Sequence, residues 1–213
     1  EFRRVLFRSP VLAATRFSRN FNNEFYCIRR PTYYTILYAG QMTTSDRGKT
    51  NSHGYLGGKG GYFNGFGGGG ISAFWTPAGS FILGRMTAKE AYDGKEIERS
   101  GRKIYTPGWQ DWANNHIIGQ TTDDKIITSA RTSWPKSQLS NGGNVLTISG
   151  KMLNRMKRQG KITDAVISYE RKYTFQDDRV VSKLVVKTDK PQSFKAFYET
   201  IPLQITEDLK ISF

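Results

Sequence analysis

The stretch Val166-Ile-Ser-Tyr-Glu-Arg-Lys-Tyr-Thr-Phe175, followed by Gln176-Asp-Asp178 and by Val180-Val-Ser-Lys-Leu-Val-Val-Lys187, decides the fold class of this 213-residue chain. Alternate residues of the first run are apolar or aromatic, namely Ile167, Tyr169, Tyr173 and Phe175. On the returning run, Val181, Lys183, Val185 and Lys187 share one face. This period of two, interrupted by a polar turn, predicts an antiparallel hairpin with one face on a core and the other in water.

Similar patterns recur from about residue 24 to the end of the chain. Runs of β-branched and aromatic residues between turn residues predict further strands at Glu24–Arg30, Tyr33–Ala39, Ile71–Thr76, Ser80–Arg85, Asn115–Gln120, Lys125–Thr132, Asn144–Ser149 and Ser193–Thr200. Helical patterns are few, and we expect short helices only over Thr87–Tyr92 and Lys151–Gln159. Many strands without βαβ alternation favour an all-β, antiparallel β-sandwich, which we expect to be one domain over residues 10–213.

Composition limits the function classes. Lys and Arg exceed Asp and Glu by 32 to 18, a formal net charge of +14, which favours anionic partners. The single cysteine, Cys27, excludes an internal disulfide, and we expect it to be a small strand residue. No run of 18 apolar residues occurs, so no membrane span is predicted.

Both ends of the chain are unusual. Residues 1–9, Glu1-Phe-Arg-Arg-Val-Leu-Phe-Arg-Ser9, resemble the translation of a short-read sequencing adapter, and we expect them not to belong to the natural protein. Without them, 29 basic and 17 acidic residues still give a net charge of +12. The other end, Glu207–Phe213, stops within a strand-like run. We therefore expect the sandwich to be incomplete at its N-terminus, and cut at its C-terminus as well.

Residues 50–70 contain ten glycines in the seventeen residues from Gly54 to Gly70. Glycine loses more backbone entropy on ordering than any other residue, so such a run is either disordered or fixed where bare backbone must approach closely. It fails as a P-loop, because His53 and Gly60 stand where that motif needs a glycine and a hydroxyl residue. With Lys59 as its single charge, it matches a nucleic-acid site poorly. Two alternatives remain: its aromatic rings plug the core, or they form the rim of a sugar-binding cleft.

The segment Trp109-Gln-Asp-Trp112 is a second candidate site. Tryptophan faces stack on the C–H faces of sugars, while amide and carboxylate groups hydrogen-bond to sugar hydroxyls. Alternatively, the two tryptophans pack against the sandwich and hold a loop in place. Of the two histidines, His53 lies among small polar residues and is a candidate for proton transfer, whereas His116 begins a strand and is expected to be structural. No metal site and no cofactor are predicted.

The basic run and the search for nucleophile motifs do not identify a further site. The basic run from Lys151 to Lys161 is interpreted mainly as a solvated surface, with contact to an anionic polymer as the alternative. No Gly-x-Ser-x-Gly motif occurs, and the sequence indicates no Cys/His pair.

Four segments in this order resemble the C-terminal β-sandwich of large secreted bacterial proteins of the polysaccharide-lyase type, including heparinase II/III-like lyases. They are Asn23–Tyr34, Gly67–Gly79, Trp109–Trp112 and Ile167–Phe175. The likeness covers most of residues 23–200 and rests on patterns. In such proteins an α/α toroid precedes a β-supersandwich, and a uronic-acid polymer lies between the two. The His-Gly-His-x-Asp segment often found in these sandwiches is absent from this chain.

The resemblance implies a secreted or periplasmic protein that acts on or binds acidic polysaccharide. Catalysis would be β-elimination and would need the missing N-terminal toroid domain of the same chain as a partner. Much of the family's catalytic machinery belongs to the toroid, so no catalytic residue is carried over from it. Within this chain, the candidate catalytic residues are His53 and Tyr55, and the candidate substrate-binding residues are Asn64, Trp109, Trp112 and Arg131. A non-catalytic glycan-binding or structural sandwich is the alternative, and a nucleic-acid-binding module is the third hypothesis.

Overall fold

The computed structural model describes residues 15–40, 67–76, 81–83, 96–99, 102–105, 115–123, 125–129, 135–154 and 165–201. These residues form three larger antiparallel sheets and a separate hairpin of β6 (Glu96–Arg99) and β7 (Arg102–Tyr105). The all-β, sandwich-like architecture predicted from the alternating runs is confirmed.

The first sheet, called here the long sheet, has the order β10-β11-β13-β14. Its strands are β10 (Lys136–Ser140), β11 (Val145–Lys151), β13 (Ile167–Phe175) and β14 (Val180–Thr188). Strands β13 and β14 form the predicted hairpin, whose turn is closed by a hydrogen bond of 3.0 Å from Gln176 N–H to Arg179 O. A single turn of 3-10 helix, η2 (Asn141–Gly143), joins β10 to β11.

The second, five-stranded sheet has the order β1-β2-β3-β4-β5. Its strands are β1 (Phe17–Phe21), β2 (Phe25–Arg30), β3 (Tyr33–Tyr38), β4 (Gly70–Trp75) and β5 (Phe81–Leu83). Pro31 and Thr32 form the turn between β2 and β3, where proline costs no ladder hydrogen bond.

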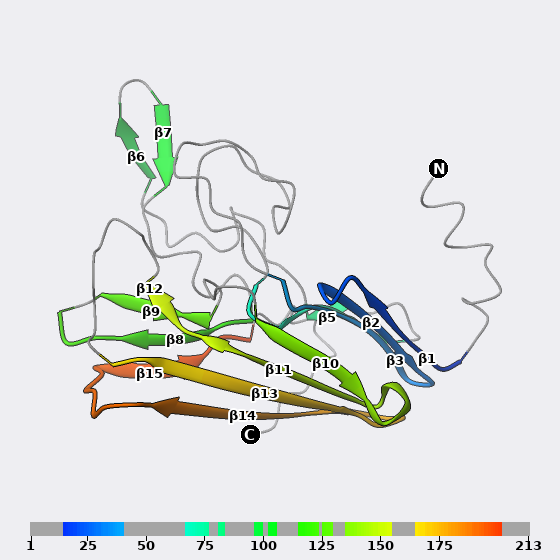
Figure 1. The fold of residues 1–213 in the computed structure, drawn as a ribbon. Coiled ribbons are helices and arrows are strands. Elements are labelled where there is room, and N and C mark those ends of the chain that lie inside the picture. Colours follow the sequence, from blue (N-terminus) through cyan, green and yellow to red (C-terminus); the bar gives the residue numbers. More distant parts are fainter. Residues whose placement is uncertain are drawn as a thin grey trace.

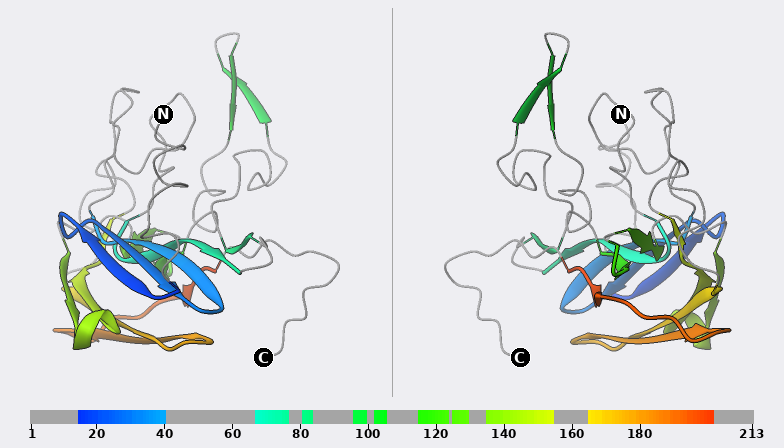
Figure 2. Two further views of the ribbon diagram at one scale, coloured as in Figure 1. Left: turned by 90° about the vertical axis from the view of Figure 1, so that its right-hand side faces the viewer. Right: turned by 90° about the vertical axis from the view of Figure 1, so that its left-hand side faces the viewer.

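The third, short sheet has the order β12-β9-β8-β15, with β12 (Leu153–Asn154), β9 (Ile126–Thr128), β8 (Ile117–Gln120) and β15 (Ala196–Glu199). Figure 1 shows the long sheet running along the molecule, with the five-stranded sheet over one end and the short sheet over the other. The side views of Figure 2 show the same layers. One face of the long sheet is therefore covered by two different sheets.

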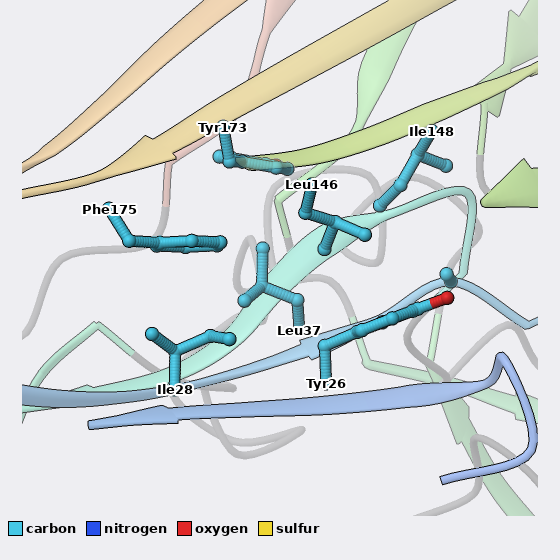
Figure 3. Close-up of a cluster of buried hydrophobic side chains, with 8 residues drawn as sticks. Tyr26, Ile28, Leu37, Leu146, Ile148, Tyr173 and Phe175 are labelled. Atoms are coloured by element: carbon cyan, nitrogen blue, oxygen red, sulfur yellow. The ribbon is translucent and has the colours of Figure 1, made fainter. Parts of the chain in front are cut away.

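Two apolar cores fill the space between the layers. The first lies between the long and five-stranded sheets and contains Tyr26, Ile28, Leu37, Ala39, Leu146, Ile148, Tyr173 and Phe175. In Figure 3 the labelled side chains of this core point toward one another from the two layers. The second lies between the long and short sheets and contains Ile117, Ile127, Met152, Ala165, Ile167 and Tyr169. A fully buried Ile or Leu of this kind stabilises the fold by roughly 2 kcal/mol.

Several local predictions need correction. The helix expected over Lys151–Gln159 is wrong at its start, because Lys151 ends β11 and Leu153–Asn154 form β12. Lys151 pairs with Ser168, and Leu153 pairs with Thr128, so this segment is held in extended conformation. The basic run has no helical period of apolar residues that would favour a helix instead. Strands β1 and β10 were not expected, because their sequences are mainly polar. The helix expected over Thr87–Tyr92 lies outside the described residues.

The end of the glycine run is described, and it is built into the fold. Gly68 and Gly69 have φ values of +66° and +84°, a backbone region that strongly favours glycine. An added Cβ at Gly68 would meet the carbonyl oxygen of Ser129, and one at Gly69 would lie 2.7 Å from the Ile148 side chain. At this end of the run, glycine is needed because strands of three sheets approach one another closely.

Candidate functional site

The candidate catalytic and substrate-binding residues named from the sequence stay predictions. They are His53, Tyr55, Asn64, Trp109, Trp112 and Arg131, and all six lie outside the described residues. The aromatic rings of the glycine run before Gly67 also lie outside them. The described residues instead contain two polar regions, one on each face of the long sheet.

The first region is the outer face of the long sheet. Because side chains alternate along a strand, the residues between the core positions point away from both cores. This face carries five lysines and one glutamate, namely Lys136, Lys151, Lys172, Lys183, Lys187 and Glu170. The five lysines are all exposed, and we call this surface the lysine face.

Strand register brings these lysines together from distant parts of the sequence. Lys172 on β13 is the direct cross-strand partner of Lys183 on β14. Two rows further along this face, beyond the row of Glu170, Ser168 pairs with Lys151 on one side and with Lys187 on the other. Like charges directly opposite each other destabilise a sheet slightly. No ion pair joins Lys172 or Lys183 to a carboxylate in the part of the chain that the structure describes.

A depression of about 510 Å³ hollows this face. Its lining consists of Lys136, Ser149, Gly150, Lys151, Ser168, Tyr169, Glu170, Val185 and Lys187. The ring of Tyr169 belongs to the second core and is only 2% exposed, so the accessible lining consists of lysine, hydroxyl and carboxylate groups together with the apolar side chain of Val185. These groups can bind anions and donate hydrogen bonds to hydroxyls.

Sequence reasoning found part of this face and missed its extent. The alternation of β14 placed Lys183 and Lys187 on one face, as the structure confirms. Lys136 lies on a strand that was not predicted, and the alternation of β13 places Lys172 on the water-facing side without indicating its neighbours. Only the register of β13 against β14 shows that Lys172 and Lys183 are neighbours.

The second polar region lies on the inner face, between the two cores, and we call it the seam cluster. It comprises Asn115, Arg171, Tyr173 and Glu199, with the carbonyl group of Thr200. Arg171 occupies a core position of β13 that the apolar pattern skips, and it is 1% exposed. It was not singled out from the sequence, although an arginine interrupting an aromatic alternation was the available signal.

Asn115 is the hub of the seam cluster. Its Oδ1 accepts hydrogen bonds from Ile71 N–H at 3.1 Å and from Arg171 Nη1 at 3.0 Å. Its Nδ2 donates to Glu199 Oε1 at 2.7 Å and to the Thr200 carbonyl oxygen at 2.8 Å. One amide side chain thus ties β4, β13 and the end of β15, which belong to three different sheets.

Charge in the seam cluster is balanced by an ion pair. Arg171 Nη1 lies 2.5 Å from Glu199 Oε1 and 2.9 Å from the Tyr173 hydroxyl oxygen. Burial lowers the pKa of Arg171, but Tyr173 and Glu199 outweigh it and hold this pKa above its ordinary value. Burial, reinforced by the charge of Arg171, lowers the pKa of His116 to about 3, so this imidazole is neutral near pH 7.

Comparison of the chain with protein families, with curated proteins and with solved structures gave no match. Among the described residues, no helix has the length and apolar character needed to cross a membrane.

Proposed function

We propose that this chain is a β-sandwich module that binds acidic polysaccharide of the uronic-acid-containing type on the lysine face of the long sheet. The observation that carries the proposal is the cross-strand juxtaposition of Lys172 and Lys183 beside the depression that Lys136, Lys151 and Lys187 help to line. Without a counter-charge, two directly opposed lysines do not stabilise the sheet, because their charges repel each other. A bound polyanion would interact favourably with both charges.

The chemistry of the face favours an acidic glycan over a neutral one. Neutral sugars are usually held by stacking on aromatic rings. The outward-facing residues of β10, β11, β13 and β14 include no aromatic side chain. Ser149 and Ser168 add hydroxyl groups that can pair with sugar hydroxyls. The face is therefore suited to a hydroxylated chain that is recognised through its charge.

The same lack of rings argues against single-stranded nucleic acid. Proteins that bind single strands combine basic grooves with aromatic platforms for the bases. On the lysine face the basic groups are present and the platforms are not. Binding to RNA would then be weaker than binding to a polyuronate of similar length, and it would depend on charge alone.

The resemblance to polysaccharide-lyase sandwiches supports the choice of a uronic-acid polymer as the ligand. By that resemblance, β-elimination would require a toroid domain in addition to the sandwich. The proposal therefore assigns binding, and not turnover, to the lysine face.

Affinity electrophoresis in gels containing polygalacturonate tests the proposal. We expect retardation of the wild-type chain, little retardation in gels containing neutral dextran, and weaker retardation with single-stranded RNA. The double variant Lys172→Ser/Lys183→Ser should lose most of the retardation. Arg19→Ser is the matched control, because Arg19 is an exposed cation on β1 of the five-stranded sheet.

Equal retardation of the double variant and the wild type would overturn the assignment to the lysine face. Stronger binding to RNA than to polygalacturonate would favour the nucleic-acid hypothesis instead.

A further inference from the structure

Glu170 lies in the middle of the lysine face. Among the outward-facing residues of the four described strands of the long sheet, it is the single carboxylate. It is exposed, and its direct cross-strand partners are Ser149 on β11 and Val185 on β14. The register of the sheet therefore places no lysine directly opposite this carboxylate.

Lysines surround Glu170 at the next positions of the register. Lys172 follows it by two residues on β13, a rise of roughly 7 Å. Lys151 on β11 and Lys183 and Lys187 on β14 occupy the diagonal positions, where cross-strand neighbours are about 7–8 Å apart. None of the ion pairs between described residues includes Glu170. Its carboxylate is thus not committed to one lysine and is accessible to a polymer bound on this face.

Glu170 also lines the depression, beside Lys136, Lys151, Lys187, Ser149 and Ser168. Lysine ammonium groups and serine hydroxyls can donate hydrogen bonds, whereas an ionised carboxylate can only accept them. A ligand group that contacts Glu170 favourably must therefore bring a hydrogen atom to donate. A sugar hydroxyl does so, and a carboxylate or sulfate group does not.

This requirement separates two kinds of acidic polysaccharide. In a polyuronate, the sugars carry free hydroxyls beside their carboxylates, so the chain can place hydroxyls at Glu170 and carboxylates at the lysines. In a densely sulfated polysaccharide, sulfates replace most of the hydroxyls, so a negative group comes close to Glu170. A like charge about 7 Å away weakens binding roughly threefold to sevenfold at effective dielectric constants between about 80 and 40.

We propose that Glu170 is a specificity-determining residue of the lysine face, which admits polyuronates and disfavours densely sulfated polysaccharides. Glu170 accepts hydrogen bonds from sugar hydroxyls, while the surrounding lysines bind the carboxylates. A negative group placed among lysines lowers the attraction for every polyanion, but it lowers it most for the ligand that cannot avoid the negative group. The inference rests on the proposed function, because it requires acidic polysaccharide to lie on this face.

Isothermal titration calorimetry of the full chain at low salt, with polygalacturonate and with dextran sulfate of similar chain length, tests this role. Glu170→Gln keeps the size of the side chain and an acceptor oxygen but removes the charge. Its affinity for dextran sulfate should rise about threefold to sevenfold, and its affinity for polygalacturonate should rise by less than about twofold. The ratio of the two affinities is the readout, because a purely structural role of Glu170 would not change it.

Asp178→Asn is the matched control. Asp178 is an exposed carboxylate in the turn after β13, and it pairs with Arg179. It lies beyond Phe175, which is roughly 17 Å along β13 from Glu170. This variant makes the same change of net charge away from the depression, so its affinity ratio should equal that of the wild type.

An unchanged affinity ratio in Glu170→Gln would overturn the inference, and so would an equal shift of the ratio in Asp178→Asn. With either result, polygalacturonate binding that depends on Lys172 and Lys183 would still support the proposed function. A folded wild-type chain that does not bind polygalacturonate would instead overturn both proposals.

Discussion

The inner and outer faces of the long sheet are built from alternate residues of the same strands, yet they place positive charge in opposite settings. On the inner face, Arg171 is buried, and Glu199 and Asn115 hold it. On the outer face, Lys172 and Lys183 stand opposite each other in water. The inner cation is linked through Asn115 to strands of three sheets, while these outer cations form no described ion pair.

Because of this difference, we expect the inner face to determine the stability of the fold and the outer face to determine binding. A buried charge that loses its partner costs several kcal/mol, whereas an exposed charge contributes little either way. Changes on the inner face should therefore alter the free energy of unfolding, and changes on the lysine face should alter affinity for polyanions. Four variants test this division, from the largest expected effect on stability to the smallest.

Arg171→Met removes the inner cation and should lower the free energy of unfolding by about 3–5 kcal/mol. The reason is that the Glu199 carboxylate and the Tyr173 hydroxyl lose the guanidinium that contacts them. Urea denaturation measures the change. The double variant Arg171→Met/Glu199→Gln should recover part of the loss, because no unpaired charge remains. A loss below about 1 kcal/mol in the single variant would contradict the role given to this ion pair.

Gly69→Ala should lower the free energy of unfolding by about 2 kcal/mol or more. Its φ of +84° strains any L side chain, and its Cβ would lie 2.7 Å from Ile148 Cδ1 on the inner face. Gly142→Ala is the matched control, because it shares a positive φ of +61° but meets only Asn144 Nδ2, at 4.0 Å. We expect a loss of about 1 kcal/mol there. Equal losses would show that crowding at the seam is unimportant.

His116 should make stability fall in acid. The pKa of about 3 in the folded chain lies below its ordinary value of 6.5. Between these two values the unfolded chain binds the proton and the folded chain does not. The stabilisation is therefore complete above pH 6.5 and is lost as pH falls toward 3, by up to about 1.4 kcal/mol per pH unit.

Urea denaturation of wild type and His116→Asn, at several pH values from 7 to 4 in chloride buffers, checks this slope. The variant should show a weaker pH dependence than the wild type. Parallel curves for the two proteins would mean that His116 takes up its proton as readily in the folded chain as in the unfolded one.

Lys183→Ser should leave the free energy of unfolding unchanged or raise it by up to about 0.5 kcal/mol, because it relieves the repulsion between directly opposed lysines. Lys172→Ser should behave in the same way. A loss above about 1 kcal/mol would place these lysines in the structural framework and remove the contrast between the two faces.

The sequence predicts the β13–β14 hairpin and the sandwich class well, because period-two alternation reports directly on which residues face a core. The same periodicity failed for β10, whose Lys136-Ser-Gln-Leu-Ser140 run is mainly polar because β10 lies at an edge of the sheet. The helix predicted from Lys151 onward was also wrong at its start, because pairing with β13 determines the conformation of Lys151.

The two polar regions were harder to predict. Lys172 and Lys183 become neighbours only through strand register, which a one-dimensional pattern does not give. Arg171 and Asn115 are 56 positions apart, and their hydrogen bond depends on how three sheets meet. The glycine run left two alternatives open, disorder or close backbone approach, and at Gly68 and Gly69 the structure shows close approach.

The most direct test of the central claim is the salt dependence of polygalacturonate binding, measured by isothermal titration calorimetry from low to moderate salt. For the wild-type chain and for Arg19→Ser, the logarithm of the binding constant should fall steeply with the logarithm of salt concentration. For Lys172→Ser/Lys183→Ser, binding should be weaker and the slope shallower, with the free energy of unfolding unchanged. The same slope and affinity in all three proteins would contradict the claim that the lysine face binds the polymer.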